Sequence, residues 1–173
     1  MAENKAKECG VWLNEALRVF PNLAGKDIRA EYKEMSGLDT SVLNYYSKKD
    51  LDLDPEGLLL GENTNVRETL VVSPKYEIFV NSRLLRVRTP AIRKPVVQHS
   101  IMHHLLAIEE REAIAGDATV EKRRLVTHSK KFDEKVFQKF NQLRELSGIA
   151  KIEKIEHLET AIHRIMHTIN WWQ

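Results

Sequence analysis

Two histidines in one apolar run constrain this chain more than any other feature. Residues 96–106 read Val-Val-Gln-His-Ser-Ile-Met-His-His-Leu-Leu, so His99 and His103 lie four positions apart in a mostly apolar stretch. On an α-helix, positions i and i+4 lie on one face, one turn apart. Both imidazoles can then reach one cation from the same side, with bonds of about 2.0–2.1 Å if the metal is zinc.

A third imidazole follows near the start of another predicted helix, in Thr127-His128-Ser129-Lys130-Lys131-Phe132. Three nitrogen ligands and an open fourth position are what a catalytic zinc requires. The i,i+4 spacing alone is weak evidence, because His163 and His167 share it. The apolar helix, the strand-like segment before it and the distant third histidine strengthen the first pair. We therefore predict a Zn²⁺ site with His99, His103 and His128 as its ligands.

This pattern resembles a known family. A helix reading Val-Val-x-His-Glu-x-x-His, followed by a loop and then His-Ser-x-x-Phe, is typical of the SprT-like and WLM (YgjP-like) minimal zinc metallopeptidases, which are zincins. The resemblance covers roughly residues 65–140, and it rests on Val96, Val97, His99, His103, His128, Ser129 and Phe132. It implies a zincin-like fold, the same three metal ligands, and hydrolysis of peptide bonds in a protein or peptide substrate.

One departure from the family concerns the catalytic position. The glutamate that follows the first histidine in the family, and that deprotonates the metal-bound water, is Ser100 here. A serine hydroxyl is not basic near neutral pH and cannot replace it. Three explanations stay open: a non-catalytic relative that kept the metal, a base supplied by another carboxylate such as Glu109 or one of the acidic loop around Asp52, or an engineered inactivating change. An active form would carry glutamate at position 100.

Composition places the chain among single-domain globular proteins. Its 173 residues are 42% apolar and 30% charged, which is enough for one core. The single cysteine, Cys9, excludes an intrachain disulfide framework and a cysteine-rich zinc ribbon. The charged start and the lack of a run of roughly 18 apolar residues predict a cytoplasmic protein without a membrane partner.

The periodicity along the chain predicts an α+β fold. We expect a small mixed or antiparallel sheet, an active-site helix, a second helix that carries the third ligand, and N- and C-terminal helices. Residues 1–148 would form a zincin-like domain, and residues 149–173 an amphipathic helix packed on it. Predicted helices cover residues 3–20, 94–112 (with Pro95 in the first turn), 129–146 and 150–169, and predicted strands cover 27–33, 42–46, 68–72 and 76–80.

Two further groups of residues have weaker predicted roles. Glu109 or Glu110 could hydrogen-bond to a metal-ligating histidine and orient its ring, although a solvated acidic helix end is the simpler interpretation. A short span without acidic residues suits phosphate backbones, which predicts a non-catalytic metal- and nucleic-acid-binding module as the alternative function. That span contains Arg83, Arg86, Arg88, Arg93 and Lys94. Against it, the formal net charge of +2 gives no overall reason to expect an anionic partner.

Overall fold

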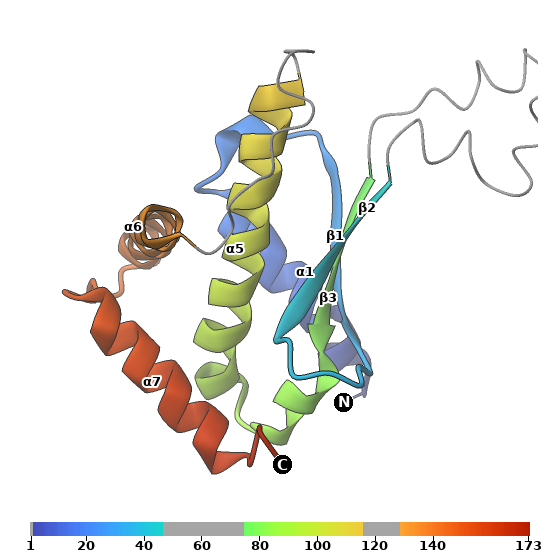
Figure 1. Ribbon diagram of the computed structural model, residues 1–173, viewed down its shortest axis with the longest axis vertical. Helices are drawn as coiled ribbons and strands as arrows, with labels where there is room; N and C mark the ends of the chain where they lie inside the picture. Colours follow the sequence, from blue (N-terminus) through green and yellow to red (C-terminus); the bar gives the residue numbers. More distant parts are fainter. Residues whose placement is uncertain (1, 47–74, 116–128) are drawn as a thin grey trace, which may run out of the picture.

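The structure, a computed structural model, describes residues 2–46, 75–115 and 129–173. This part of the chain is α+β, with four α-helices and one three-stranded mixed sheet (Figure 1). The described elements are α1 (Ala2–Leu17), the 3-10 turn η1 (Pro21–Leu23), β1 (Asp27–Lys33), β2 (Ser41–Tyr46), β3 (Lys75–Asn81), the 3-10 turn η2 (Ser82–Arg86), α5 (Pro90–Ala115), α6 (Lys130–Leu146) and α7 (Ile155–Thr168). The predicted fold class is thus confirmed at the level of α+β with a small mixed sheet.

The sheet has the order β1-β3-β2, so the last described strand lies in the middle. β3 runs parallel to β1 and antiparallel to β2, and Ile78 at its centre pairs with Ala30 on one side and Leu43 on the other. Ile78 is fully buried, and most of β3 is buried with it, whereas no residue of β1 is fully buried. Because β1 and β2 are the outer strands, each has one free edge among the described strands. The strand predicted at residues 68–72 lies outside the described part of the chain.

Helix α5 is the central element of the fold. It begins at Pro90, where a missing backbone N–H costs nothing, four residues before the predicted start. Pro95 consequently lies inside the helix and not in its first turn, which corrects the prediction. Figure 1 shows α5 between the sheet and α1 on one side and α6 and α7 on the other. One helix thus supplies side chains to two packing layers.

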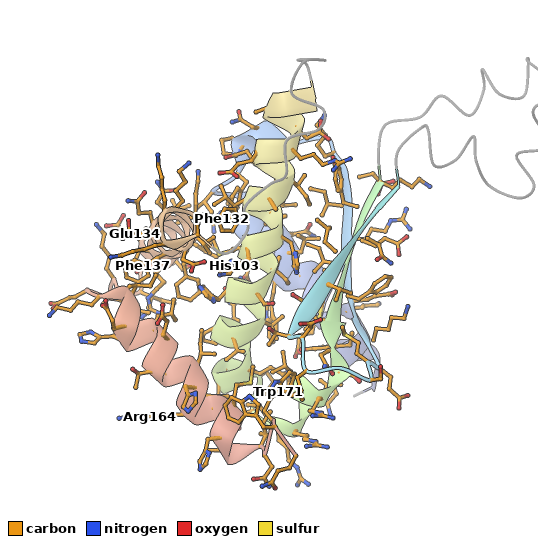
Figure 2. The ribbon with its side chains drawn as sticks, viewed as in Figure 1. His103, Phe132, Glu134, Phe137, Arg164 and Trp171 are labelled. Carbon is orange, nitrogen blue, oxygen red and sulfur yellow. The ribbon has the colours of Figure 1, made fainter. Side chains whose placement is uncertain are left out.

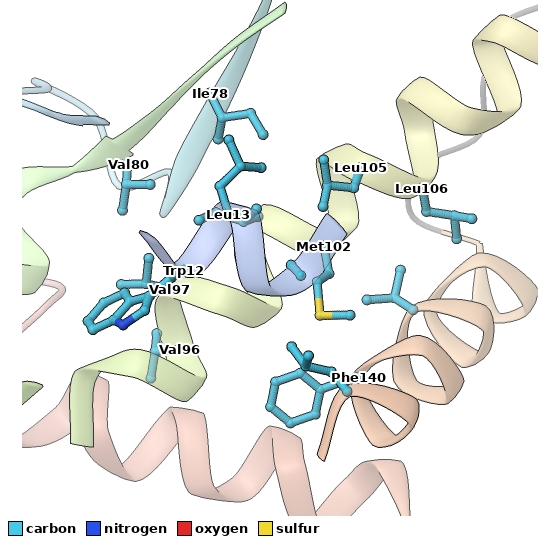
Figure 3. Close-up of a cluster of buried hydrophobic side chains, with 14 of the residues drawn as sticks. Trp12, Leu13, Ile78, Val80, Val96, Val97, Met102, Leu105, Leu106 and Phe140 are labelled. Atoms are coloured by element: carbon cyan, nitrogen blue, oxygen red, sulfur yellow. The ribbon is translucent and has the colours of Figure 1, made fainter. Parts of the chain in front are cut away.

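The core surrounds α5 on these two sides. The periodicity of residues 94–112 predicts that Ile101, Leu105 and Ile108 face the core, and all three have no exposed surface. Figure 3 shows the apolar side chains of α1, β3, α5 and α6 that meet there, with Met102 and Phe140 among them. Contiguous burial of this kind is the main favourable term in folding, at about 25 cal/mol per Å² of apolar surface.

Helix α6 begins within one residue of its predicted start, whereas α7 begins five residues later than predicted. Ser129 caps α6, because its side chain accepts a hydrogen bond from the N–H of Phe132 at 3.1 Å. α7 begins at Ile155 and not at residue 150. The side-chain amide of Asn141 donates to the carbonyl of Ile152 and accepts from its N–H, each at 2.9 Å, and these bonds hold Ile152 outside the helix.

The C-terminal residues are anchored on the rest of the fold. Trp171 is 3% exposed, and its indole N–H donates to the carbonyl of Leu38 at 3.1 Å. The guanidinium of Arg83 donates to the carbonyl of Trp171 at 2.6 Å and also lies over its ring. Leu158 and Met166 of α7 join the common core. None of the described helices has both the length and the apolar character needed to cross a membrane.

A buried ion pair joins α1, β1 and the start of α5. Arg93, 1% exposed, donates from Nε and Nη2 to the two carboxylate oxygens of Glu8 at 2.9 and 2.7 Å. Its remaining nitrogen, Nη1, donates to the carbonyl of Val87, and the hydroxyl of Tyr32 donates to Glu8. Burial raises the pKa of the neighbouring Cys9 thiol to about 12, with the Glu8 charge adding to the effect. Each of the three guanidinium nitrogens of Arg93 thus has a hydrogen-bond partner inside the protein.

Removing one partner of this pair should destabilise the protein strongly. We expect Arg93→Met to lower the free energy of unfolding by about 3–5 kcal/mol, because Glu8 would remain buried without its counter-charge. Arg29→Met is the matched control, since its ion pair with Asp27 at 3.4 Å is exposed, and it should cost no more than about 1 kcal/mol. Urea unfolding measures both changes. Equal losses in the two variants would contradict a dominant role for the buried pair.

Candidate functional site

Helix α5 places His99 and His103 side by side on the face turned toward α6. Their ring centroids are 4.7 Å apart and their planes are nearly perpendicular, at 89°. Phe140 and Phe132 of α6 each lie 5.7 Å from one of these rings, Phe140 from His99 and Phe132 from His103. Figure 2 shows His103 in the region between α5 and α6. Two aromatic rings thus restrict the orientations that the imidazoles can adopt.

An acidic residue on α6 faces one of the histidines. Asp133 Oδ1 lies 3.9 Å from Nδ1 of His103, with the two side chains 37% and 24% exposed. A carboxylate beside one ring nitrogen favours the proton on that nitrogen and leaves the other nitrogen as an acceptor. Asp133 was not among the site residues predicted from the sequence. The sequence did contain a signal. Asp133 lies in the first turn of the helix that follows His128, and this turn must lie near α5 if His128 shares a metal ion with His99 and His103.

The surroundings of His99 keep its imidazole neutral. Burial lowers the pKa of His99 to about 3, and the nearby His103 contributes in the same direction. A neutral ring has a free lone pair, which is the form that binds metal ions. Near neutral pH, His99 is therefore ready to act as a ligand without first losing a proton.

The residue that follows His99 takes part in a chain of hydroxyl groups. Ser100 Oγ lies 2.5 Å from Oγ of Ser41, and Ser41 Oγ lies 2.7 Å from Nε2 of His104. Ser41 is the first residue of β2, so this network ties α5 to the edge of the sheet. The pattern of α5 gave no sign of it, because a contact between residues 59 positions apart depends on tertiary structure.

These side chains lie in a cleft of about 580 Å³, a size typical of ligand sites. The cleft is bounded by α5, by the residues leading into β2, by the start of α6 and by the inner face of α7. The described residues that line it are Leu38, Asp39, Thr40, Ser41, Val96, His99, Ser100, His103, His104, Asp133, Ile155, Glu159, Ile162, His163, Met166 and Trp172. One hollow thus contains the histidine pair, the hydroxyl network and an apolar wall.

The third predicted ligand, His128, lies outside the described residues. Within residues 2–46, 75–115 and 129–173, no group of three or more His, Cys, Asp or Glu side chains is arranged to hold a metal ion. The described part of the predicted site is therefore the pair His99 and His103. The three-histidine set stays a prediction.

The two glutamates with a predicted supporting role lie in a different hollow from the histidine pair. Glu109 and Glu110 line a separate depression, and Glu110 Oε1 lies 3.5 Å from Nζ of Lys135 on α6. The charge of Glu110 is thus partly balanced by a lysine. A supporting role for either residue at a metal site stays a prediction.

The five basic residues of the alternative function do not form one surface. Arg93 is buried against Glu8, which removes it from any phosphate-binding patch, and Nζ of Lys94 lies 2.8 Å from Glu15. Arg83, Arg86 and Arg88 do line one shallow depression of about 460 Å³, together with an acidic residue. Nucleic-acid binding by these three arginines stays an untested prediction.

Comparison of the chain with protein-family models, with curated proteins and with solved structures finds no match in any of the three.

The low pKa of His99 should make stability fall in mild acid. The ordinary value is 6.5, so below that pH the unfolded state binds a proton that the folded state excludes down to about pH 3. The free energy of unfolding should then decrease as the pH falls, by at most about 1.4 kcal/mol per pH unit from this residue.

Urea unfolding at several pH values between about 7 and 5, with a chelator present, measures this dependence. His99→Asn should flatten it, whereas His167→Asn, at an exposed position of α7, should leave it unchanged. A slope that is the same in all three proteins would show that His99 titrates normally in the folded state.

Proposed function

We propose that this protein is a zinc-dependent metallopeptidase-like protein of the zincin type, related to the SprT-like and WLM (YgjP-like) families, or a descendant that kept the metal site. The observation that carries the proposal is the histidine pair His99 and His103, whose ring centroids lie 4.7 Å apart inside a cleft and of which His99 is held neutral by burial. His128 would be the third ligand. Peptide-bond hydrolysis is the activity to which this site would belong.

The donor set fits zinc. A separation of 4.7 Å between ring centroids lets both imidazoles reach one ion, since each zinc–nitrogen bond is about 2.0–2.1 Å long. Imidazole nitrogen is a preferred zinc donor, and the low pKa of His99 supplies it in the required neutral form. Asp133 lies where a carboxylate would orient the ring of His103. Bound zinc would polarise a peptide carbonyl and lower the pKa of a water molecule.

The remaining residues of the cleft would position the substrate. Thr40 and Ser41 lie at the start of β2, which pairs with β3 and has its other edge free among the described strands. An extended peptide can bind such an edge through backbone hydrogen bonds alone. Ser100 holds the position next to His99, and its hydroxyl is occupied by Ser41. Without a carboxylate there, we expect wild-type peptidase activity to be weak or absent.

Metal analysis tests the proposed site. We expect the purified protein to retain about one zinc ion per chain after dialysis, because three imidazoles are a ligand set that holds catalytic zinc in proteins. His99→Ala, His103→Ala and His128→Ala should each abolish this retention, and Asp133→Asn should weaken zinc binding about 10–100-fold. His167→Ala removes an exposed histidine of the same spacing and should retain the metal. Equal zinc content in all five variants, or none in the wild type, would refute the metal site.

Restoring a carboxylate tests the link to peptide hydrolysis. Ser100→Glu should raise cleavage of a mixed fluorogenic peptide library in the presence of zinc by about 10²–10⁴-fold, the usual contribution of a positioned general base. The double variant His99→Ala/Ser100→Glu is the control and should be inactive, because the metal ligand is gone. Absence of cleavage by Ser100→Glu while zinc is bound would remove the enzymatic interpretation and leave a metal-binding protein.

A further inference from the structure

The inner face of α7 gives the cleft an apolar wall opposite the histidine face of α5. Ile155, Ile162 and Met166 come from the helix, and Trp172 follows its end. Met166 is buried, the two isoleucines are half-buried, and Trp172 is 50% exposed. On the other side of α7, Arg164 points away from α5 (Figure 2). The apolar side chains thus face the same hollow as His99 and His103.

Trp172 is held at this wall although half of its surface remains exposed. Its neighbour Trp171 is fixed by the carbonyl of Leu38 and by Arg83. The ring of His163 lies 5.0 Å from the ring of Trp172 and covers part of it. A large indole whose backbone is fixed and whose face borders a cleft can accept an apolar side chain with little loss of conformational freedom.

The charge of the cleft differs in sign from that of the whole chain. The formal net charge of the protein is +2. Among the described residues that line the cleft, the acidic ones are Asp39, Asp133 and Glu159, and none is lysine or arginine. Counting histidines as neutral, this surface is negative. A phosphate backbone would meet three carboxylates there, whereas a cationic ligand would be attracted.

We infer that the cleft binds a positively charged peptide, with a large apolar side chain against Trp172 and Ile162 and a lysine or arginine beside Asp39 or Glu159. The apolar wall and the carboxylates of the cleft select this occupant together. The apolar surface alone would accept any hydrophobic group, and the carboxylates alone would accept any cation. The inference rests on the proposed function in one respect: the peptide would be the substrate held beside the histidine pair. The cleft volume of about 580 Å³ accommodates only a few side chains of such a peptide.

Fluorescence anisotropy of the full chain with short labelled peptides tests this inference. A peptide that alternates phenylalanine with lysine should bind at least about tenfold more tightly than one with phenylalanine and glutamate, or one with alanine and lysine. Trp172→Ala should weaken binding about tenfold, and Trp172→Phe should restore most of it. Glu159→Lys should weaken binding of the basic peptide about tenfold, whereas Glu156→Lys makes the same charge change at an α7 residue outside the lining of the cleft and should have little effect.

Several results would overturn the inference. Equal affinity for the basic and acidic peptides would exclude charge selection, and equal effects of Glu159→Lys and Glu156→Lys would exclude the cleft. Competition by a single-stranded oligonucleotide that is lost in Trp172→Ala would assign the cleft to nucleic acid instead. Melting temperatures of all variants exclude unfolding as the cause of a loss.

The same titrations with a chelator and with His99→Ala separate this inference from the proposed function. Selective binding of the basic peptide by a wild-type protein that retains no zinc after dialysis would support the peptide site and refute the metallopeptidase. Zinc retention without selective binding of the basic peptide would support the metal site and refute the inference about the peptide.

Discussion

The bidentate ion pair between Arg93 and Glu8 fixes the element on which the rest of the structure depends. It holds the first turn of α5 against α1, and Tyr32 of β1 donates to the same carboxylate. Because a buried guanidinium has five donors in a rigid plane, the carboxylate and the carbonyl of Val87 can satisfy it in only a narrow range of orientations. The pair therefore sets both the position of α5 and its rotation about its own axis.

The rotation of α5 decides which residues reach the cleft. Arg93 lies six positions, or less than two turns, before His99, so an error in the orientation of the first turn would move the histidines off the face toward α6. Val97, Ile101 and Leu105 occupy the buried side of the same helix with no exposed surface. Packing of this buried side and the ion pair in the first turn both fix the rotation of α5. The histidine pair and the hydroxyl network are positioned as a consequence of that rotation.

Local pattern was sufficient for part of this fold. The limits of β1 were predicted to the residue, and the inward face of α5 followed from its periodicity. The parallel pairing of β1 with β3 could not be predicted, because it joins residues 48 positions apart, such as Asp27 and Lys75. The same limit applies to the site. Helical spacing brought His99 and His103 together, whereas Ser41, Asp133 and Trp172 reach the cleft only through tertiary packing that no local pattern encodes.

A hydrogen-bonded network that starts at Ser100 occupies the position at which the SprT-like and WLM families have a carboxylate. The hydroxyl of Ser100 is half-buried and needs a partner, which Ser41 supplies, and Ser41 in turn is joined to His104. The two hydroxyl groups carry no charge, so they do not add to the negative charge of Asp39, Asp133 and Glu159 at the same hollow. A glutamate at position 100 would add a fourth carboxylate beside the histidine pair, and a bound divalent cation would balance it. The serine thus removes a demand for charge compensation, which is consistent with a cleft in which Asp39 and Glu159 attract a cationic ligand.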